Sequence, residues 1–187
     1  LVLSNLMVEA GAKAALFPFD GKTAAYLRKG GADVGTPVEA TSGARYVDEI
    51  GCDLPAIAPQ IARPHSPDNV VPLTACAGLA VQMVFLGTCT GGRVDDFHEA
   101  LEAFTGAGGR LASGLQLVLT PASRAVHDTL EADGTLATFR RAGAIVTETG
   151  CGACCGTSGV IPGDGMTVLS TANRNFKARM GNRTASI

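Results

Sequence analysis

The sequence predicts an α/β fold in which a mostly parallel sheet is covered on both faces. Apolar runs of strand length alternate with segments of helical spacing over the C-terminal two thirds of the chain. The 187 residues are 46% hydrophobic and 17% charged, which is enough apolar material to fill a core. The 24 glycines show no collagen period, so they indicate many tight turns and places where the backbone approaches a ligand closely.

The first part of the chain is expected to hold two helices and a strand. Residues 6–15 form the first expected helix and residues 23–28 the second. Asp20 is placed to cap the second helix, because a side-chain oxygen there can accept from the free amides of the first turn. Residues 45–50 are expected to form a strand.

Residues 53–69 are the best candidate for a linker. Proline removes donors from a strand ladder and ends helices, and this stretch is rich in it. We therefore place a domain boundary near Pro59, with one domain over residues 1–59 and a second over residues 60–187. The prolines of the stretch are Pro55, Pro59, Pro64 and Pro67.

Beyond this boundary the patterns of strands and helices alternate. In parallel sheets of this kind, ligands bind beyond the carboxyl ends of the strands, so functional side chains are expected in the loops that follow each strand. Strands are expected over residues 80–87, 115–119, 144–147 and 166–170, and helices over residues 94–104, 122–130 and 136–142.

Two of these loops contain cysteines between glycines. Cys89 follows the first strand, and Cys151, Cys154 and Cys155 follow the third. A Cys-x-x-Cys loop can place two thiolates on one metal, and the flanking glycines let the backbone turn around it and offer amides to sulfur. The obvious ligand set is Cys89, Cys151 and Cys154, because the adjacent Cys155 is badly directed toward the same centre.

Spacing alone leaves three interpretations of these cysteines open. They can hold a metal or a metal cluster, although a zinc site would want four protein ligands and this set supplies three. They can carry thiol redox chemistry, which shares the Cys-x-x-Cys spacing. They can also simply pack. Cys52 and Cys76 lie apart from the others and are expected to be structural, since a lone cysteine usually behaves as a small hydrophobe.

A basic segment at residues 173–179 follows the last strand. Arg174 and Arg179, five residues apart, can grip a substrate with two carboxylates through forked hydrogen bonds, and a solvated basic turn is the alternative. At the other end of the chain, Asn5 and Glu9 lie one helical turn apart and share a face. On spacing alone that pair indicates only a surface position.

Charge and hydropathy exclude several classes of partner. The 17 acidic and 15 basic residues give a net charge of -2, and neither sign clusters, so the sequence carries no electrostatic footprint for nucleic acid or an anionic membrane. The apolar runs fall short of the roughly 20 residues that a membrane span needs. We expect a soluble, cytoplasmic protein whose partners are small molecules or other proteins.

These motifs, in this order, resemble the aconitase superfamily, and within it the large subunits of the 3-isopropylmalate dehydratase and homoaconitase branch. The resemblance runs through essentially all 187 residues. Residues 5–12 match an Asn-x-x-x-Glu-x-Gly-Ala segment of that branch. The other matching segments are residues 64–70, 87–93, 151–156 and 173–179.

The resemblance implies a cofactor and a fold. Cys89, Cys151 and Cys154 would hold a 4Fe-4S cluster by three thiolates, leaving one iron without a protein ligand. That iron could take the hydroxyl and a carboxylate of the substrate as a Lewis acid. The fold would be of the three-layer α/β/α aconitase type, with residues 1–59 part of the second domain and residues 60–187 the third, cluster-binding domain.

The resemblance also implies a reaction. A 2-hydroxy di- or tricarboxylate would be dehydrated and then rehydrated at the neighbouring carbon. Glu9 would orient or protonate the departing hydroxyl with Asn5 assisting, and Asn173, Arg174 and Arg179 would bind substrate carboxylates. We favour 3-isopropylmalate dehydratase activity in leucine biosynthesis, with homoaconitase, 2,3-dimethylmalate dehydratase and aconitase activities as alternatives.

The sequence departs from the family pattern in ways that limit the expected activity. Many relatives have Asn in place of Gly91, and an aliphatic residue is common in place of Cys155; neither change removes a ligand. The family's first domain is missing from this segment, and the last catalytic domain is a separate small subunit in this branch, joined in a heterodimer or heterotetramer. We expect the segment alone to be inactive. A cluster-free structural or RNA-binding fragment is the alternative of another class, although scarce aromatics disfavour RNA.

Overall fold

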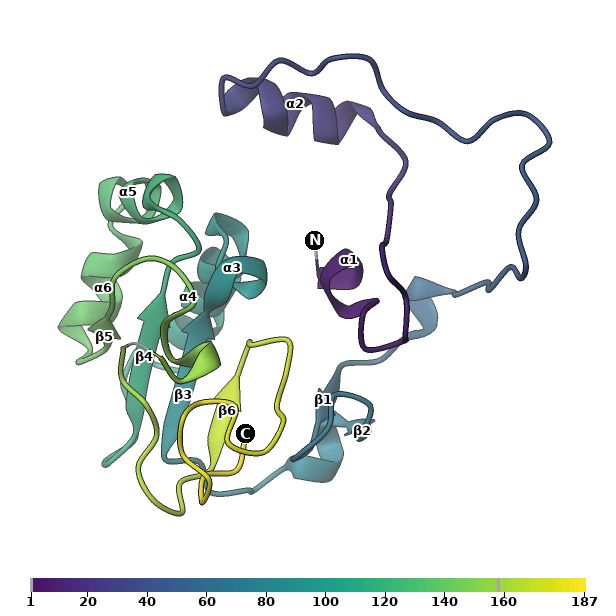
Figure 1. Cartoon of the computed structure of the whole chain (residues 1–187). Coiled ribbons are helices and arrows are strands. Elements are labelled where there is room, and N and C mark those ends of the chain that lie inside the picture. Colours follow the sequence, from purple (N-terminus) through teal and green to yellow (C-terminus); the bar gives the residue numbers. More distant parts are fainter. Residues whose placement is uncertain (1, 158) are drawn as a thin grey trace. The chain divides into compact units, whose positions relative to one another are not determined.

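The computed structural model describes residues 2–157 and 159–187, and it divides into two compact units. The first consists essentially of residues 3–57 and the second of residues 58–187. Each unit is described by itself (Figure 1). Within the described residues, no helix combines the length and the apolar character that a bilayer crossing requires.

The first unit contains little regular structure. Its helices are α1 (Val2–Leu6) and α2 (Gly21–Lys29), with a short 3-10 turn at η1 (Leu54–Ala56). The expected cap of α2 is confirmed, because the Asp20 carboxylate accepts a hydrogen bond of 2.7 Å from the Thr23 amide. That short bond satisfies one of the amides that the first turn leaves open.

Two expectations for the first unit are wrong. The helix expected over residues 6–15 does not form. Helix α1 ends at Leu6, and only turns follow as far as Gly11, whose φ of +81° is incompatible with helix. Residues 45–50 form no strand. In both places most of the large apolar side chains are exposed, among them Val8, Val47 and Ile50, so little tertiary packing stabilises the local pattern.

The second unit begins with a small hairpin. Strand β1 (Gln60–Ala62) pairs antiparallel with β2 (Val70–Pro72), and η2 (Leu73–Cys76) follows. The stretch expected as a linker therefore contains a strand and most of the loop that joins it to its partner. Pro64 and Pro67 lie in that loop, where no ladder donor is needed.

A four-stranded parallel sheet forms the centre of the second unit. Its strands follow the order β5-β4-β3-β6, so the two neighbours of β3 come from distant parts of the chain. All three pairings are parallel, which confirms the predicted α/β class with a mostly parallel sheet. The strands are β3 (Met83–Gly87), β4 (Gln116–Thr120), β5 (Ile145–Val146) and β6 (Val168–Ser170).

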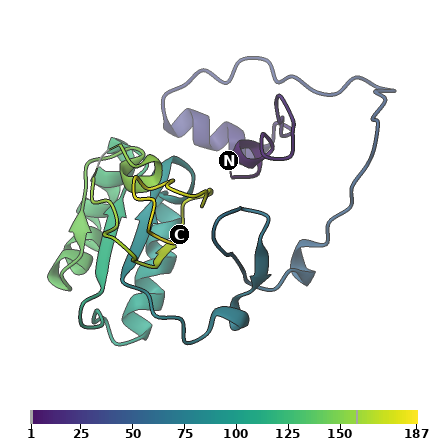
Figure 2. The ribbon, with the colours of Figure 1, turned by 60° about the horizontal axis from the view of Figure 1, so that its bottom comes forward.

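Helices cover one face of this sheet (Figures 1 and 2). Phe97, Leu130 and Phe139 from three helices pack on Leu117 and Leu119 of β4, and all five are buried. The expected helices are thus confirmed, with boundaries shifted by one or two residues. They are α4 (Val94–Gly106), α5 (Arg124–Ala132) and α6 (Thr135–Arg141), and a single turn, α3 (Thr88–Gly91), precedes them.

The other face is covered by the cysteine loop and the C-terminal segment. Phe85 and Val118 of the sheet share a buried cluster with Ala153 and Cys154 of η3 (Gly152–Cys155) and with Met180. Each of these residues is at most 5% exposed. The loop that carries the candidate ligands is therefore part of a hydrophobic core.

Candidate active site

Three loops meet at the carboxyl edge of the sheet, where the candidate site lies. They follow β3, β5 and β6, whose ends share an edge because the strands are parallel. The Gly87 amide donates to the Thr171 hydroxyl at 2.9 Å, which joins the loops after β3 and β6. The Gly150 amide donates to the Pro121 carbonyl at 3.1 Å, which joins the loops after β5 and β4.

Close packing at two glycines brings these loops together. A Cβ at Gly87, where φ is +143°, would lie 2.1 Å from the Thr120 carbonyl oxygen. A Cβ at Gly152, where φ is +55°, would lie 2.5 Å from the Thr120 hydroxyl oxygen. No real side chain tolerates such distances, so only glycine allows the strand ends to approach this closely.

The backbone is strained next to Cys89. Thr88 is buried and has a φ of +86°, a conformation that is uncommon for any side chain and most unfavourable for a β-branched one. Such strain persists only where the surroundings impose it, and it concentrates at functional sites. Sequence reasoning missed this feature, because nothing in a Gly-Thr-Cys pattern gives a dihedral angle.

Three cysteines lie within electrostatic reach of Cys151: Cys89, Cys154 and Cys155. Cys154 is buried and Cys155 half-buried, whereas Cys89 and Cys151 are exposed. The pKa of Cys151 is raised, first by loss of hydration and then by the charges of Cys155, Cys89 and Cys154. The structure thus brings the three predicted ligands together from two loops. Their mutual repulsion opposes ionisation, and a bound cationic centre would reverse that opposition.

Cys155 has surroundings of its own. Its sulfur lies 2.9 Å from the hydroxyl oxygen of Thr157. That hydrogen bond is the main reason why the pKa of Cys155 is lowered. This partner distinguishes Cys155 from the three predicted ligands.

Arg179 reaches the cysteines from the loop after β6. Its Nη2 donates to the Cys154 sulfur at 3.7 Å. Its Nε is buried and has no hydrogen-bond partner among the described residues. Asn173 and Arg174 precede it in the same loop; both are half-buried and both take part in interactions. One predicted carboxylate-binding residue is therefore in contact with a predicted ligand.

Asn175 is a residue of the basic loop whose importance the sequence pattern does not indicate. It is only 6% exposed, and its Nδ2 donates to the Arg63 carbonyl at 2.8 Å and to the Ala62 carbonyl at 3.4 Å. Next to it, the backbone of Phe176 pairs with that of His65. A sequence pattern cannot reveal these contacts, because the partners lie more than 100 residues apart.

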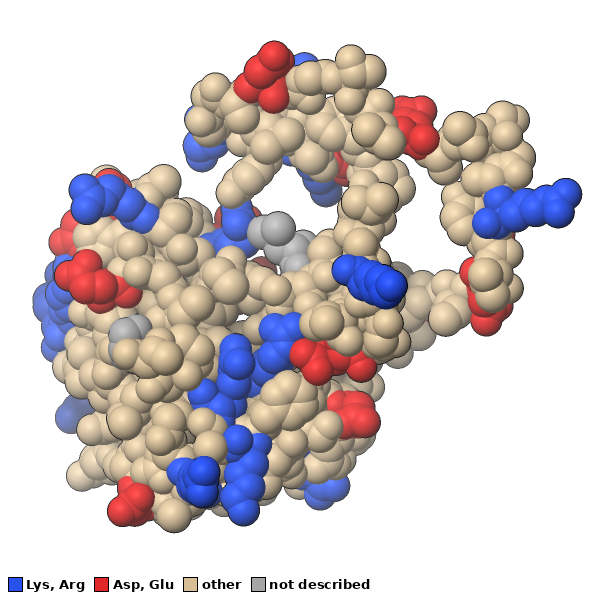
Figure 3. Space-filling view, in the orientation of Figure 1, with Lys and Arg blue, Asp and Glu red and all other residues tan. Residues whose placement is uncertain are grey.

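Basic residues outnumber acidic ones in the C-terminal part of the second unit. The sequence as a whole predicts that neither sign clusters, but residues 149–187 contain one acidic residue, Asp164, and four basic ones. Figure 3 shows Lys and Arg side chains gathered on the face of the second unit that the C-terminal segment occupies. Such a concentration favours an anionic ligand. The basic residues are Arg174, Lys177, Arg179 and Arg183.

Asn5 and Glu9 belong to the first unit, which is described separately from the cysteines. Asn5 lies in α1 and Glu9 in the turn that follows, where its amide donates to the Leu6 carbonyl at 2.9 Å. Both side chains are exposed and both take part in interactions. The helix expected over residues 6–15 does not form, so Glu9 is not in a helix.

Thiolates are the ligands that iron-sulfur clusters take, so the chemistry of the three cysteines suits such a cluster. In the described part of the chain, no three His, Cys, Asp or Glu side chains are placed to hold one metal ion. An iron-sulfur cluster takes each thiolate on a different iron, so its ligands face one another without converging on a point.

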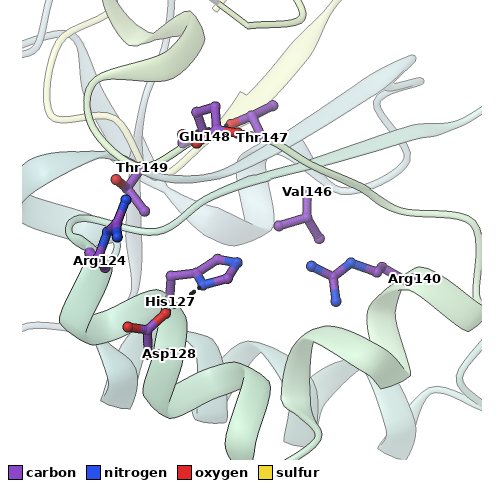
Figure 4. A pocket seen from close by; sticks show the side chains of 8 residues that line it. All are labelled: Arg124, His127, Asp128, Arg140, Val146, Thr147, Glu148 and Thr149. Carbon is purple, nitrogen blue, oxygen red and sulfur yellow. Dashed lines mark hydrogen bonds and ion pairs between the residues drawn. The ribbon is translucent and has the colours of Figure 1, made fainter.

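A separate cavity of about 290 Å³ lies between α5, α6 and the end of β5 (Figure 4). His127 and Arg140 line it, but His127 is 3.1 Å from Asp128, and Arg140 is 2.7 Å from Glu131. Its Arg, Asp and Glu side chains are balanced in number, with Arg124 and Arg140 against Asp128 and Glu148. No predicted site residue lines it; the lining consists of Arg124, His127, Asp128, Arg140, Val146, Thr147, Glu148 and Thr149.

Comparison with known proteins gives one consistent result. The model of the aconitase family (aconitate hydratase) matches residues 1–187. The chain is 38% identical to the 3-isopropylmalate dehydratase large subunit 1 of Methanopyrus kandleri, over all of this chain and 44% of that protein. It is 41% identical to the large subunit 1 of Deinococcus radiodurans, over all of this chain and 42% of that protein.

A third relative, the 3-isopropylmalate dehydratase large subunit 2 of Archaeoglobus fulgidus, is 38% identical over all of this chain and 45% of its own length. The chain thus spans less than half the length of these relatives. The family model, in contrast, matches the chain from end to end. The chain belongs to the aconitase family.

Proposed function

We propose that this chain is the cluster-binding segment of the large subunit of a hydro-lyase of the 3-isopropylmalate dehydratase type. The observation that carries the proposal is the meeting of Cys89, Cys151, Cys154 and Arg179 at one edge of the sheet. Relatives that match the whole chain are large subunits of that dehydratase, which supports the same reaction class.

The three cysteines would hold the 4Fe-4S cluster that is typical of the family. When bound, such a cluster supplies a Lewis acid at the iron that has no protein ligand. Cys154 is buried in a hydrophobic cluster and would anchor one side. Cys89 and Cys151 are exposed and would leave the other side accessible to substrate. Arg179, hydrogen bonded to the Cys154 sulfur, would place its guanidinium next to the bound substrate.

The loop after β6 would bind the carboxylates of the substrate. A guanidinium binds a carboxylate through two parallel hydrogen bonds, which fix its orientation as well as its position. The Nε of Arg179 still has an open donor, which suits such an acceptor. Arg174 and Asn173, in the same basic loop, would bind the same substrate.

Glu9 would handle the hydroxyl group that leaves. As a general acid it would give a proton to the departing oxygen, and in the reverse direction it would take one from water. Asn5 would orient the same oxygen. In this proposal residues 1–59 form part of the second aconitase-type domain and residues 60–187 the third, and the function needs both.

The remaining parts of the enzyme are also proposals. A small subunit carrying the last catalytic domain would complete the site, and the rest of the large subunit would supply further residues. The 187 residues alone would therefore be inactive. The assembled enzyme would work in the cytoplasm on a small hydroxy-carboxylate, without nucleic acid or membrane.

Turnover by the assembled enzyme tests the proposal. The large subunit containing this segment is purified without oxygen, combined with its small subunit and given 3-isopropylmalate, citrate, homocitrate or 2,3-dimethylmalate in parallel. We expect dehydration and rehydration of 3-isopropylmalate to be fastest. Preference for another of the four would change the substrate, and no turnover of any would overturn the proposed reaction.

A further inference from the structure

Asn175 joins two segments that are distant in the sequence. Its Nδ2 donates to the carbonyls of Arg63 and Ala62, at the end of β1 and the start of the loop that leads to β2. We call residues 63–69 the hairpin loop. One residue further along, the backbones of Phe176 and His65 pair in parallel. These contacts fix the hairpin loop against the basic loop after β6.

The hairpin loop is braced internally, so a tether at one end holds all of it. The Asn69 side chain donates to the Pro64 carbonyl at 3.1 Å, and the Arg63 amide donates to the Asn69 carbonyl at 2.9 Å. The Ser66 hydroxyl is hydrogen bonded to Asp68. A displacement at Arg63 would therefore move the loop as a body.

Two buried polar atoms in the loop after β6 have no partner among the described residues. They are the Oδ1 of Asn175, which accepts, and the Nε of Arg179, which donates. Buried polar atoms in proteins are almost always hydrogen bonded, and exceptions point to a missing ligand or ordered water. Asn175 directly precedes Phe176, the residue that pairs with His65, and the Arg179 amide donates to the Phe176 carbonyl at 2.9 Å. The open hydrogen-bonding capacity thus lies where the hairpin loop is attached.

We propose that Asn175 is a positioning residue and that the hairpin loop it holds forms one wall of the carboxylate-binding site. The tether keeps His65, an exposed residue, beside the segment that carries Arg174 and Arg179. Imidazole can donate to a carboxylate oxygen, so His65 adds a donor to those of the two arginines. This inference rests on the proposed function, because it concerns the same substrate.

The test compares single variants in the assembled enzyme. Asn175→Ala removes the hydrogen bonds to Arg63, in the hairpin loop, and to Ala62, at the end of β1. We expect its KM for 3-isopropylmalate to rise about tenfold, with a smaller change in kcat. Amide hydrogen exchange over residues 61–66 should become faster, because the tether is gone. Asn182→Ala is the matched control: its side chain also donates to a backbone carbonyl, that of Pro162 at 3.1 Å, but holds another loop.

The variant His65→Ala gives a second test that does not depend on folding. His65 is exposed, so the substitution removes the imidazole without disturbing the core, and we expect a severalfold rise in KM.

Three outcomes would count against the inference or the function on which it rests. An unchanged KM in Asn175→Ala, with faster exchange over residues 61–66, would reduce Asn175 to a structural tether and overturn the inference. An unchanged KM in His65→Ala would remove the hairpin loop from the site. If the unsubstituted enzyme turned over no hydroxy-carboxylate, the proposed function itself would fail.

Discussion

The two units of this chain use their apolar side chains in opposite ways. In the first, Leu16, Val47 and Ile50 are at least 90% exposed, and Ala24 alone of its described hydrophobic residues is buried. In the second, two separate clusters bury large side chains on both faces of the sheet. Burial of apolar surface is the main stabilising contribution to folding, so the stability of the chain resides in the second unit.

The comparison of the two units shows which candidate site residues lie on a well-packed part of the chain. Cys154 and Ala153 lie in the same buried cluster as Phe85 of the sheet. Glu9 follows a helix of five residues in which nothing is buried. Exposed apolar side chains in such number favour association with another surface. We therefore expect the ligand loops to be ordered by their own unit, and the segment around Glu9 to be ordered by other parts of the enzyme.

Glu9→Gln separates catalysis from stability and has the largest expected effect. The substitution keeps the size of the side chain and removes its charge and its exchangeable acid proton. General acid-base catalysis contributes a factor of about 100 to 10,000, so turnover of the assembled enzyme should fall by that order. Iron content should not change, and stability should stay within about 0.5 kcal/mol. Full turnover in this variant would remove Glu9 from the site.

Matched phenylalanine substitutions test the comparison directly. Phe85 in the second unit is 0% exposed and Phe17 in the first is 60% exposed. Truncation of a buried phenylalanine costs about 3–5 kcal/mol, so Phe85→Ala should lose that much free energy of unfolding. Phe17→Ala should change it by less than about 0.5 kcal/mol. Denaturant unfolding measures both, and equal losses would contradict the division of stability between the units.

Arg179→Lys tests the role of the arginine that links the loop after β6 to Cys154. Lysine keeps the positive charge but loses the planar fork of donors. A hydrogen bond to a charged group is worth about 1.5–3 kcal/mol, so substrate affinity or turnover should fall about tenfold to a hundredfold. Steady-state kinetics on the assembled enzyme give this value. Unchanged kinetics would make Arg179 a structural residue.

A substitution at Asp164 should have the smallest effect, a change in how stability depends on pH. Hydrogen bonds from Asn182 and Thr184 lower the pKa of its carboxyl below the ordinary value of 3.8. A folded-state pKa below the unfolded value means that stabilisation is fully present above pH 3.8 and is lost as the pH falls through the folded pKa. Asp164→Asn should therefore lower stability at neutral pH and lose less of it on acidification. Unfolding curves between neutral and acid pH that run parallel for both proteins would contradict this.

The sequence predicts best the elements whose apolar pattern is buried. The strand expected over residues 115–119 is β4, and the helix expected over residues 94–104 is α4, because both patterns face the core that forms. The pattern over residues 45–50 predicts a strand equally well, yet none forms. Nothing in that unit packs against those side chains, and a local pattern does not contain this information.

The candidate site also contains some residues that the sequence predicts and others that it does not. Spacing within a loop identifies Cys151 and Cys154, and the rule for parallel sheets places them at the same edge as Cys89. The role of Asn175 depends on carbonyls more than 100 residues away, and the strain at Thr88 on a dihedral angle. Neither is local, so neither could be predicted from composition or spacing.

The most direct test of the central claim, that Cys89, Cys151 and Cys154 hold an iron-sulfur cluster, is the iron and acid-labile sulfide content of serine variants purified without oxygen. Visible absorption is recorded on the same samples. Each of the three variants should be colourless and contain no stoichiometric iron, because three thiolates are already the minimum for a cluster with an open iron. Cys155→Ser and Cys52→Ser, the controls, should keep the iron and sulfide of the unsubstituted protein. A colourless Cys155 variant beside a Cys151 variant that keeps its iron would contradict the account.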